Sequence, residues 1–257
     1  ESYIEFLTKS NIKSNTLRRK IASLKVFYSY LKFQGIIDEN PFNQLRFQFR
    51  KEKILPKTIP YDILKSVYSD SEQKVIYSKS KYQKQKAERN LLIISLLLST
   101  GIRISELCHI HLKDINFSNR TLHIIGKGKK ERILFLGDQT TFSLLKKYIN
   151  KYCVRPNDYL FTGQNPLKAL SEQSVRLILK KLVKKNNLSI TITPHMFRHS
   201  FATMLLDKDV DIRYIQQILG HSSISVTQIY THVSQSKQKE ILTLCNPISS
   251  IRSRPQK

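Results

Sequence analysis

Acidic residues are scarce in this 257-residue sequence. It contains 19 Asp and Glu against 44 Lys and Arg, which gives a formal net charge of +25 at pH 7. Such an excess bears on binding partners more than on fold, because every phosphate that a Lys or Arg side chain neutralises releases condensed counterions. General solubility and an anionic membrane surface are the two alternatives, but the excess favours a nucleic acid as the partner.

Long apolar runs, cysteine pairs and secretory signals are absent as well. The longest apolar run, Leu91–Leu98, is far shorter than the roughly 20 residues that span a bilayer, and no secretory signal opens the sequence. Three widely spaced cysteines, Cys108, Cys153 and Cys245, make no disulfide framework. With only 7 Gly and 8 Pro and 40% hydrophobic residues, the composition is not that of a disordered chain. We therefore expect a folded protein of the reducing cytoplasm.

The N-terminal part of the sequence has a helical pattern with a basic face. Apolar residues recur at three- and four-residue steps from Ser14 to Gly35, and Arg18 and Lys25 lie on the opposite face. The stretch 49–60 is charged, contains two prolines and has no period, which is typical of a linker. We predict a small helical domain over residues 1–48, a linker over 49–58 and a larger domain over 59–257.

The larger domain is predicted to be mostly helical. Two segments that alternate with period two, Thr121–Ile125 and Arg132–Leu136, flank the sequence GKGKKE and indicate a β-hairpin. The polar stretch 71–88 is either a mobile insertion or an exposed helix. The fold class is therefore mainly α with a small antiparallel sheet. The expected helices are Tyr61–Tyr68, Asn90–Ser99, Gln139–Lys151, Ser171–Lys185, Pro194–Leu206, Asp211–Leu219, Ser225–His232 and Gln235–Leu244.

The segment TPHMFRHS has the features of a helix start that binds an anion. Thr193 is a capable N-cap and Pro194 suits the first helical position, which puts His195 in the first turn. Backbone N–H groups are free there, and the helix dipole favours an anion. Arg198 comes three residues later and shares the face of His195. The pair could cradle a phosphate; the alternative is a capping histidine beside a solvated arginine.

The same segment contains a possible pair of metal ligands. His195 and His199 have the four-residue spacing of two zinc ligands on a helix. No carboxylate lies between them in the place of a base, and Cys108, His109 and His111 are the only other clustered candidates. We therefore expect no metal site.

Two further basic residues stand where the backbone is expected to turn. Arg103 follows Gly101 at a helix start, and Glu106 is close enough to pair with it, although a lone surface pair usually contributes little. Lys127 lies between two glycines at the hairpin tip, where a backbone can approach a ligand closely and a lysine can swing. A solvent-exposed turn is the alternative for Lys127.

The sequence LGHSSISVTQIYTH brings a histidine and a tyrosine close to the end of the chain. Gly220 ends an apolar helix, His221 follows in the turn, and Tyr230 comes nine residues later. A tyrosine in a helix more often serves packing than catalysis, and the chain has 12 of them. Position alone therefore leaves the role of Tyr230 open.

Taken together, these segments resemble the tyrosine recombinases of the phage integrase family, and most closely the Xer-type members. The stretches TGIRISEL, GKGKKER, PHMFRHSFAT, LGH and TQIYTH are similar to the motif boxes of that family and have the same order. The separations also fit: 24 residues from Arg103 to Lys127, 26 from His195 to His221 and nine from there to Tyr230. The likeness covers nearly the whole chain, since residues 14–41 resemble the family's helical core-binding domain.

The resemblance implies a two-domain, C-shaped clamp: a helical, SAM-like core-binding domain, truncated at its start, and a tyrosine recombinase catalytic domain. The stretch 71–88 is longer than in Xer-type members. Tyr230 would be the nucleophile that forms a 3′-phosphotyrosyl intermediate and Lys127 the general acid, with no cofactor and no metal. The implied catalytic residues are Arg103, Lys127, His195, Arg198, His221 and Tyr230, with Glu106 in support.

The function that the resemblance implies is that of a site-specific DNA recombinase or integrase, such as a mobile genetic element carries. Its partners would be double-stranded DNA with a specific recombination site and three further copies of the chain, as a homotetramer on two duplexes, without a membrane. It would act at the nucleoid, in the cytoplasm of a bacterial or archaeal cell. Two alternatives are a type IB topoisomerase-like enzyme that nicks and reseals one duplex, and a DNA-binding regulator with a vestigial site.

Overall fold

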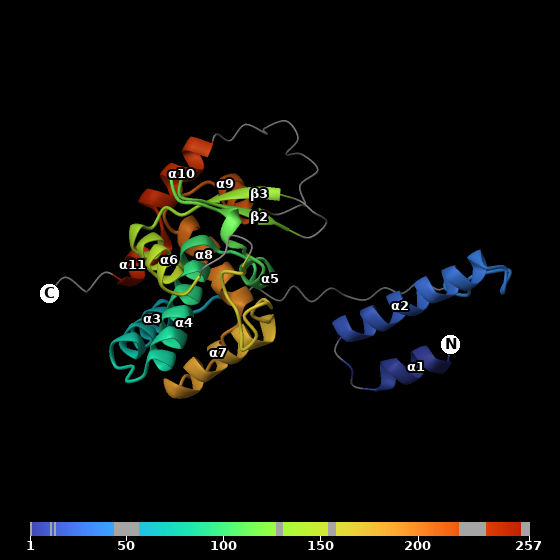
Figure 1. Cartoon of the computed structure of the whole chain (residues 1–257). Coiled ribbons are helices and arrows are strands. Elements are labelled where there is room, and N and C mark those ends of the chain that lie inside the picture. Colours follow the sequence, from blue (N-terminus) through green and yellow to red (C-terminus); the bar gives the residue numbers. More distant parts are fainter. Residues whose placement is uncertain are drawn as a thin grey trace. The chain divides into compact units, whose positions relative to one another are not determined.

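The computed structural model describes residues 2–10, 12, 14–43, 57–126, 131–153, 158–220 and 235–252. The chain divides into two compact units, Glu1–Leu55 and Pro56–Lys257, and each is described by itself (Figure 1). Within the described ranges, none of the helices combines the length and the apolar character that crossing a bilayer requires. The mainly helical fold with one small antiparallel sheet agrees with the predicted fold class.

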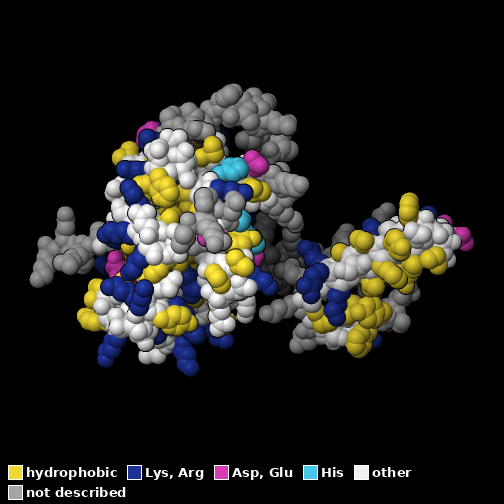
Figure 2. Space-filling view, viewed as in Figure 1, with side chains coloured by type: hydrophobic (Ala, Val, Ile, Leu, Met, Phe, Trp, Pro, Cys, Tyr) yellow, Lys and Arg dark blue, Asp and Glu magenta, His cyan; other side chains and the backbone are white. Residues whose placement is uncertain are grey.

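The described residues of the first unit form two helices around a very small core. Helix α1 is Ser2–Lys9 and helix α2 is Ser14–Phe33. The core residues are Leu7, Leu17, Ile21 and Phe42. Several large apolar side chains of the unit remain in contact with solvent, as the hydrophobic surface in Figure 2 shows: Tyr3, Phe6, Val26, Phe27, Tyr30, Phe33 and Ile36. A unit of this size buries only a modest share of its surface.

The second unit holds the remaining elements and one continuous hydrophobic core. Its helices and strands are α3 (Tyr61–Ile76), α4 (Lys81–Thr100), α5 (Ile104–Cys108), a 3₁₀ turn (Leu112–Asp114), β1 (Ile115–Asn116), β2 (Thr121–Ile125), β3 (Glu131–Phe135), α6 (Gln139–Tyr152), α7 (Glu172–Lys185), α8 (Pro194–Leu206), α9 (Ile212–Leu219), α10 (Gln235–Leu244) and α11 (Pro247–Arg252).

Helix α4 is the central element of this unit. Every residue from Leu91 to Thr100 is buried, and α3, α6, α8 and α11 pack around the helix (Figure 1). A helix end that is apolar on all sides is buried in this way because each face needs a neighbour. The helix begins at Lys81, earlier than predicted, where the Ser80 side chain accepts a hydrogen bond from the Gln83 backbone at 3.2 Å.

The polar stretch 71–88 is helical over most of its length. It consists of the end of α3, a turn at 77–80 and the start of α4. The stretch therefore agrees with the exposed-helix interpretation.

The sheet confirms the predicted hairpin. Strands β2 and β3 pair antiparallel, with Leu122 opposite Leu134 and Ile124 opposite Arg132, and β1 pairs with the other edge of β2. Strand β2 has the predicted bounds, whereas β3 begins one residue earlier than predicted. The tip of the hairpin, residues 127–130, lies outside the described residues.

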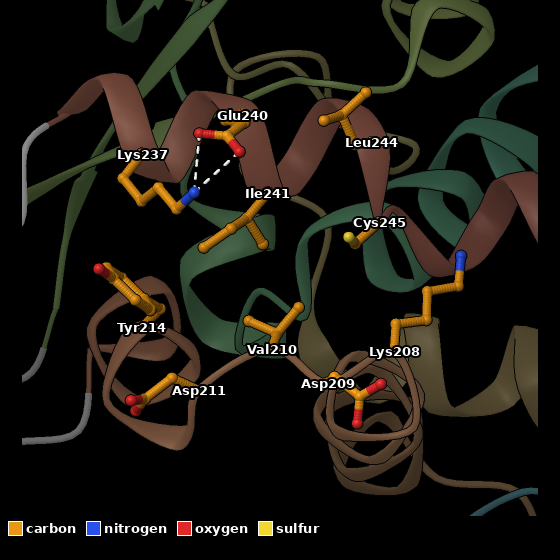
Figure 3. Close-up of a pocket in the computed structure, with 10 residues that line it drawn as sticks. All are labelled: Lys208, Asp209, Val210, Asp211, Tyr214, Lys237, Glu240, Ile241, Leu244 and Cys245. Carbon is orange, nitrogen blue, oxygen red and sulfur yellow. Dashed lines mark hydrogen bonds and ion pairs between the residues drawn. The ribbon is translucent and has the colours of Figure 1, made fainter.

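The C-terminal helices pack on their own chain. Leu242 of α10 is fully buried beside β3, and Ile248 and Ile251 of α11 enter the main core. Arg252 closes this contact, since its guanidinium donates to Asp138 and, at 2.7 Å, to the Tyr68 hydroxyl. Helices α10 and α11 thus form part of the core of the second unit. A cavity of about 270 Å³ remains between α10 and residues 208–214 (Figure 3).

Candidate active site

The junction of α4 and α5 sets the position of Arg103. Helix α4 stops at Gly101, whose φ of 60° lies in the left-handed region that favours glycine. A Cβ atom there would lie 2.5 Å from the ring of Phe201 in α8, so the turn has no room for a side chain at this position. Arg103 is the N-cap of α5, which confirms its predicted place at a helix start.

Glu106 is a buried carboxylate that two arginines share. The Arg103 backbone N–H donates to Oε2 and its Nη1 to Oε1, both at 3.0 Å. Arg132 of β3 donates from Nη1 and Nη2 to the two oxygens, both at 2.8 Å, in a two-pronged fork. Burial by itself would raise the pKa of the Glu106 carboxyl, but Arg132 and then Arg103 hold that pKa below its ordinary value. The carboxyl is therefore ionised at neutral pH.

Helix α8 begins as predicted and carries one buried and one exposed site residue. The Thr193 side chain caps the helix, and Pro194 is its first residue. Arg198 is only 7% exposed, and its Nη1 donates to the Gly101 carbonyl at 2.9 Å, so the solvated-arginine alternative is wrong. His195 is exposed in the first turn, where its side chain has no hydrogen-bond partner among the described residues.

Arg103 and Arg198 converge on the end of α9. Nη2 of Arg198 donates to the Leu219 carbonyl at 2.6 Å, and Nη2 of Arg103 donates to the Gly220 carbonyl at 3.0 Å. Gly220 ends the helix with a φ of 66°, as the sequence predicts. Because these two carbonyls are consecutive, both guanidinium groups are fixed at one place, immediately before the segment 221–234.

Arg103, Arg132 and Arg198 form a three-arginine cluster around the single carboxylate of Glu106. Burial in the first place, and then the positive charge of Arg103, lower the pKa of Arg198 to about 10, so this side chain remains protonated at neutral pH. A cationic excess that is held by backbone carbonyls in a largely buried place attracts an anion strongly, since few water molecules screen it.

Three of the seven residues predicted for the site are brought together by the structure: Arg103, Glu106 and Arg198. His195 lies in the first turn of the helix that carries Arg198. The other three predicted residues lie outside the described residues: Lys127, His221 and Tyr230.

Arg132 belongs to the site, although the sequence analysis assigns it only to a strand. It is the last residue of the stretch GKGKKER and faces the same side of β3 as the buried Leu134, because side chains two apart on a strand share a face. A charged residue on the inward face of a short strand needs a buried partner, and this is the signal that could have identified it.

Among the described residues, the two histidines of α8 have no third ligand group beside them. The pKa of His199 is lowered, by burial first and then by His195 and Arg198. In the part of the chain that the structure describes, no three His, Cys, Asp or Glu side chains are grouped so that they could hold a metal ion.

Comparison with known proteins identifies the family. The model described as "Phage integrase family" matches residues 67–237. A tyrosine recombinase of Agathobacter rectalis is 48% identical over 250 residues, which is 96% of this chain and 81% of the relative. The tyrosine recombinase XerC of Bacillus subtilis is 36% identical over 242 residues, covering 90% of this chain and 75% of XerC.

A solved structure is similar over almost the same length. The XerH site-specific recombinase bound to a palindromic difH substrate, in a post-cleavage complex, superposes with a TM-score of 0.68 and 25% identity. The match covers 95% of this chain and 71% of that chain. The motif boxes, the arginine cluster and these relatives all indicate the same family. The chain belongs to the phage integrase family and is a site-specific tyrosine recombinase, an enzyme that cuts and rejoins DNA.

Proposed function

We propose that the phenol oxygen of Tyr230 attacks the phosphorus of a DNA phosphodiester. The new bond joins Tyr230 to the 3′-phosphate, and the bond from phosphorus to the 5′-oxygen breaks. A 5′-hydroxyl of another strand then attacks the phosphotyrosine, reseals the backbone and frees the tyrosine. The phosphotyrosine bond conserves the energy of the phosphodiester bond that was cut. The cycle therefore requires no cofactor.

The observation that supports this proposal is the convergence of Arg103 and Arg198 on the end of α9. Their guanidinium groups donate to the carbonyls of Leu219 and Gly220, so the cationic charge is fixed at the last described residues before His221, and Tyr230 follows ten residues after Gly220 in the sequence. Two guanidinium forks would hold the non-bridging oxygens of the phosphate better than ammonium groups, because a fork can donate two parallel hydrogen bonds. Glu106 supports Arg103 and does not touch the phosphate.

Proton transfer is assigned to the remaining predicted residues. Lys127 would protonate the leaving 5′-oxygen, His195 would help to accept the proton of the Tyr230 phenol, and His221 would donate a hydrogen bond to the phosphate. The exposed position of His195 beside Arg198 is compatible with contact to a substrate. Each such proton transfer typically accelerates a reaction by about 10²–10⁴-fold.

The partner in this proposal is double-stranded DNA with a specific recombination site, and four copies of the chain act on two duplexes. The excess of basic side chains supports DNA as the partner, and Figure 2 shows Lys and Arg side chains on the visible surface of each unit. The related XerH recombinase is described with its difH substrate bound, which supports a specific site as the target.

The test is a covalent adduct on a nicked duplex that carries the sequence this protein selects from a randomised pool. Wild-type protein is expected to give a shifted band on a denaturing gel. Tyr230→Phe is expected to bind the duplex but give no band, because phenylalanine keeps the ring and lacks the attacking oxygen. Tyr214→Phe, at another tyrosine near the C-terminal end, is the matched control and should retain the band.

A band that persists in Tyr230→Phe would identify another residue as the nucleophile. Relaxation of a supercoiled plasmid without the selected site would instead favour the topoisomerase-like alternative.

A further inference from the structure

We propose that Arg132 is a positioning residue of the strand-transfer site, which holds Arg103 and the end of α9 in their working arrangement. This inference rests on the proposed role of Arg103 in holding the phosphate. It goes further because it gives a task to a residue of β3 that makes no contact with the DNA in the proposed mechanism.

The first support is the fork between Arg132 and Glu106. Both prongs measure 2.8 Å, which is shorter than the two 3.0 Å bonds that Arg103 makes to the same carboxylate. The Arg132 side chain is 15% exposed and the Glu106 side chain 3% exposed, so water competes little for these bonds. Arg132 and Arg103 thus hold the same carboxylate from two different elements, so Arg132 can orient Arg103 through it.

The second support is the contact between Arg132 and Gly220. A Cβ atom on Gly220 would lie 3.0 Å from Cδ and 3.1 Å from both Nε and Nη1 of Arg132. The guanidinium thus lies directly against the residue that precedes His221 in the sequence. The glycine serves two purposes here: its φ of 66° ends α9, and its missing side chain makes room for Arg132.

The third support is an unsatisfied donor. The Nε–H of Arg132 is buried and has no hydrogen-bond acceptor among the described residues. A buried donor without an acceptor is unfavourable, and each instance in a folded protein calls for a reason. The fork geometry supplies that reason, since aligning both Nη groups with Glu106 leaves Nε facing Gly220.

Charge balance shows why the site needs Arg132. The groups that face Glu106 are Arg103 from the start of α5, Arg132 from β3 and, at longer range, Arg198 from α8. With Arg132 present, the three cations and one carboxylate leave two net positive charges for a phosphorane-like state that gains a second negative charge. Without Arg132, Glu106 would neutralise Arg103, and only one net positive charge would remain.

The experiment compares Arg132→Met and Arg132→Lys with wild type on the nicked duplex. Both variants are expected to bind the duplex within about twofold of wild type, because no DNA contact is removed. The single-turnover rate of adduct formation should fall on the order of 10²-fold in Arg132→Met, as expected for a misplaced catalytic group. Arg132→Lys should recover only part of this loss, since an ammonium keeps the charge and lacks the fork.

The matched control is Arg120→Met, the same change at an arginine in the turn that precedes β2, whose guanidinium lies over the Phe142 ring and not at the site. Its adduct rate should equal that of wild type. Thermal unfolding of all variants identifies any that fail to fold. If Arg132→Met does not fold, Arg132→Lys decides the question.

A pH profile distinguishes positioning from general stabilisation. Loss of Arg132 removes the strongest influence that lowers the pKa of Glu106, so the acid limb of the adduct rate should move to higher pH in Arg132→Met. In a Glu106→Gln background that shift should vanish, and Arg132→Met should reduce the rate far less.

Wild-type rate and pH profile in Arg132→Met, or in a folded Arg132→Lys, would overturn the inference and leave the proposed function intact. Fully additive effects of Arg132→Met and Glu106→Gln would also overturn it. The absence of any Tyr230-dependent adduct in wild-type protein would instead refute the proposed function.

Discussion

At the scale of single residues, the site is assembled around one ionised carboxylate. Glu106 accepts four hydrogen bonds from Arg103 and Arg132. The Gly220 carbonyl accepts a further bond from Arg103, and the Gly101 and Leu219 carbonyls accept bonds from Arg198. If these guanidinium groups bind the phosphate as proposed, such contacts hold the cations in place before charge develops on it. Such preorganised electrostatics is commonly the largest contribution to catalysis.

The folded-state pKa of Glu106 leads to a prediction about stability. Because this pKa is held below the ordinary value, the ionised carboxyl stabilises the fold above the unfolded-state pKa, and the stabilisation is lost as pH falls through the folded-state pKa. We expect Glu106→Gln to lower the melting temperature at neutral pH, with a difference from wild type that shrinks on acidification. Thermal unfolding measured from about pH 7 to about pH 3, which spans the titration of carboxyl groups, checks this.

Glu172→Gln provides the control for that series. Glu172 forms a solvent-exposed ion pair with Arg176 at 2.6 Å, and exposed pairs contribute little. Its melting curve should follow wild type at every pH. A Glu106→Gln deficit that stays constant down to acid pH would show that the lost charge is not the cause.

The same residues show what the sequence could reveal about the site. Arg103 and Glu106 are three positions apart at a helix start, so their pairing follows from local geometry. The fork from Arg132 to Glu106 joins residues 26 positions apart and depends on how the sheet packs against α5. No local pattern encodes that contact, and it became apparent only from the packed structure.

At the scale of secondary-structure elements, the hydrophobic period predicted α6, α7, α8 and α9 nearly to their ends, because each has one face on the core. For the first half of α4 the sequence left a mobile insertion and an exposed helix open, since KYQKQKAER has good helix formers but no apolar face. Strand β1 and helix α11 were missed for another reason. Both are short and depend on other parts of the chain. Strand β1 is stabilised by pairing with β2, and helix α11 by the burial of Ile248 and Ile251 in the core.

The end of α4 carries the prediction at this scale. Gly101→Ala should destabilise the second unit, because alanine at a φ of 60° is strained by about 1–3 kcal/mol and its Cβ would also displace the Phe201 ring. The Gly101 carbonyl would move with the turn and weaken its bond to Arg198. Urea unfolding measures the first effect, and the adduct assay measures the second.

Gly163→Ala is the matched substitution in the same unit. No atom lies within 4 Å of the Cβ that it would add, and Gly163 does not have a positive φ. Its urea midpoint should remain close to that of wild type. Equal midpoints for Gly101→Ala and Gly163→Ala would show that the tight turn after α4 is not needed.

At the scale of the whole molecule, both units carry an excess of positive charge. Residues 1–55 contain 11 Lys and Arg against 5 Asp and Glu, and residues 56–257 contain 33 against 14. The proposed mechanism uses only a few of these side chains, among them the three-arginine cluster. The other basic side chains are suited to contacts with the phosphates of a DNA duplex. Such contacts position a protein on DNA without reading the DNA sequence. This distribution supports the expectation, which the family resemblance implies, that both units contact DNA.

Salt dependence tests that expectation for the whole molecule. Each phosphate neutralised by Lys or Arg adds about 0.9 to the slope of log affinity against log salt concentration. If both units contact the backbone, the slope should correspond to several phosphates, and affinity should fall steeply between low and physiological salt. Sucrose added at equal osmolality adds no ions and should leave affinity unchanged. A flat salt response would mean that the basic side chains are only solvated, and the clamp would lose its physical basis.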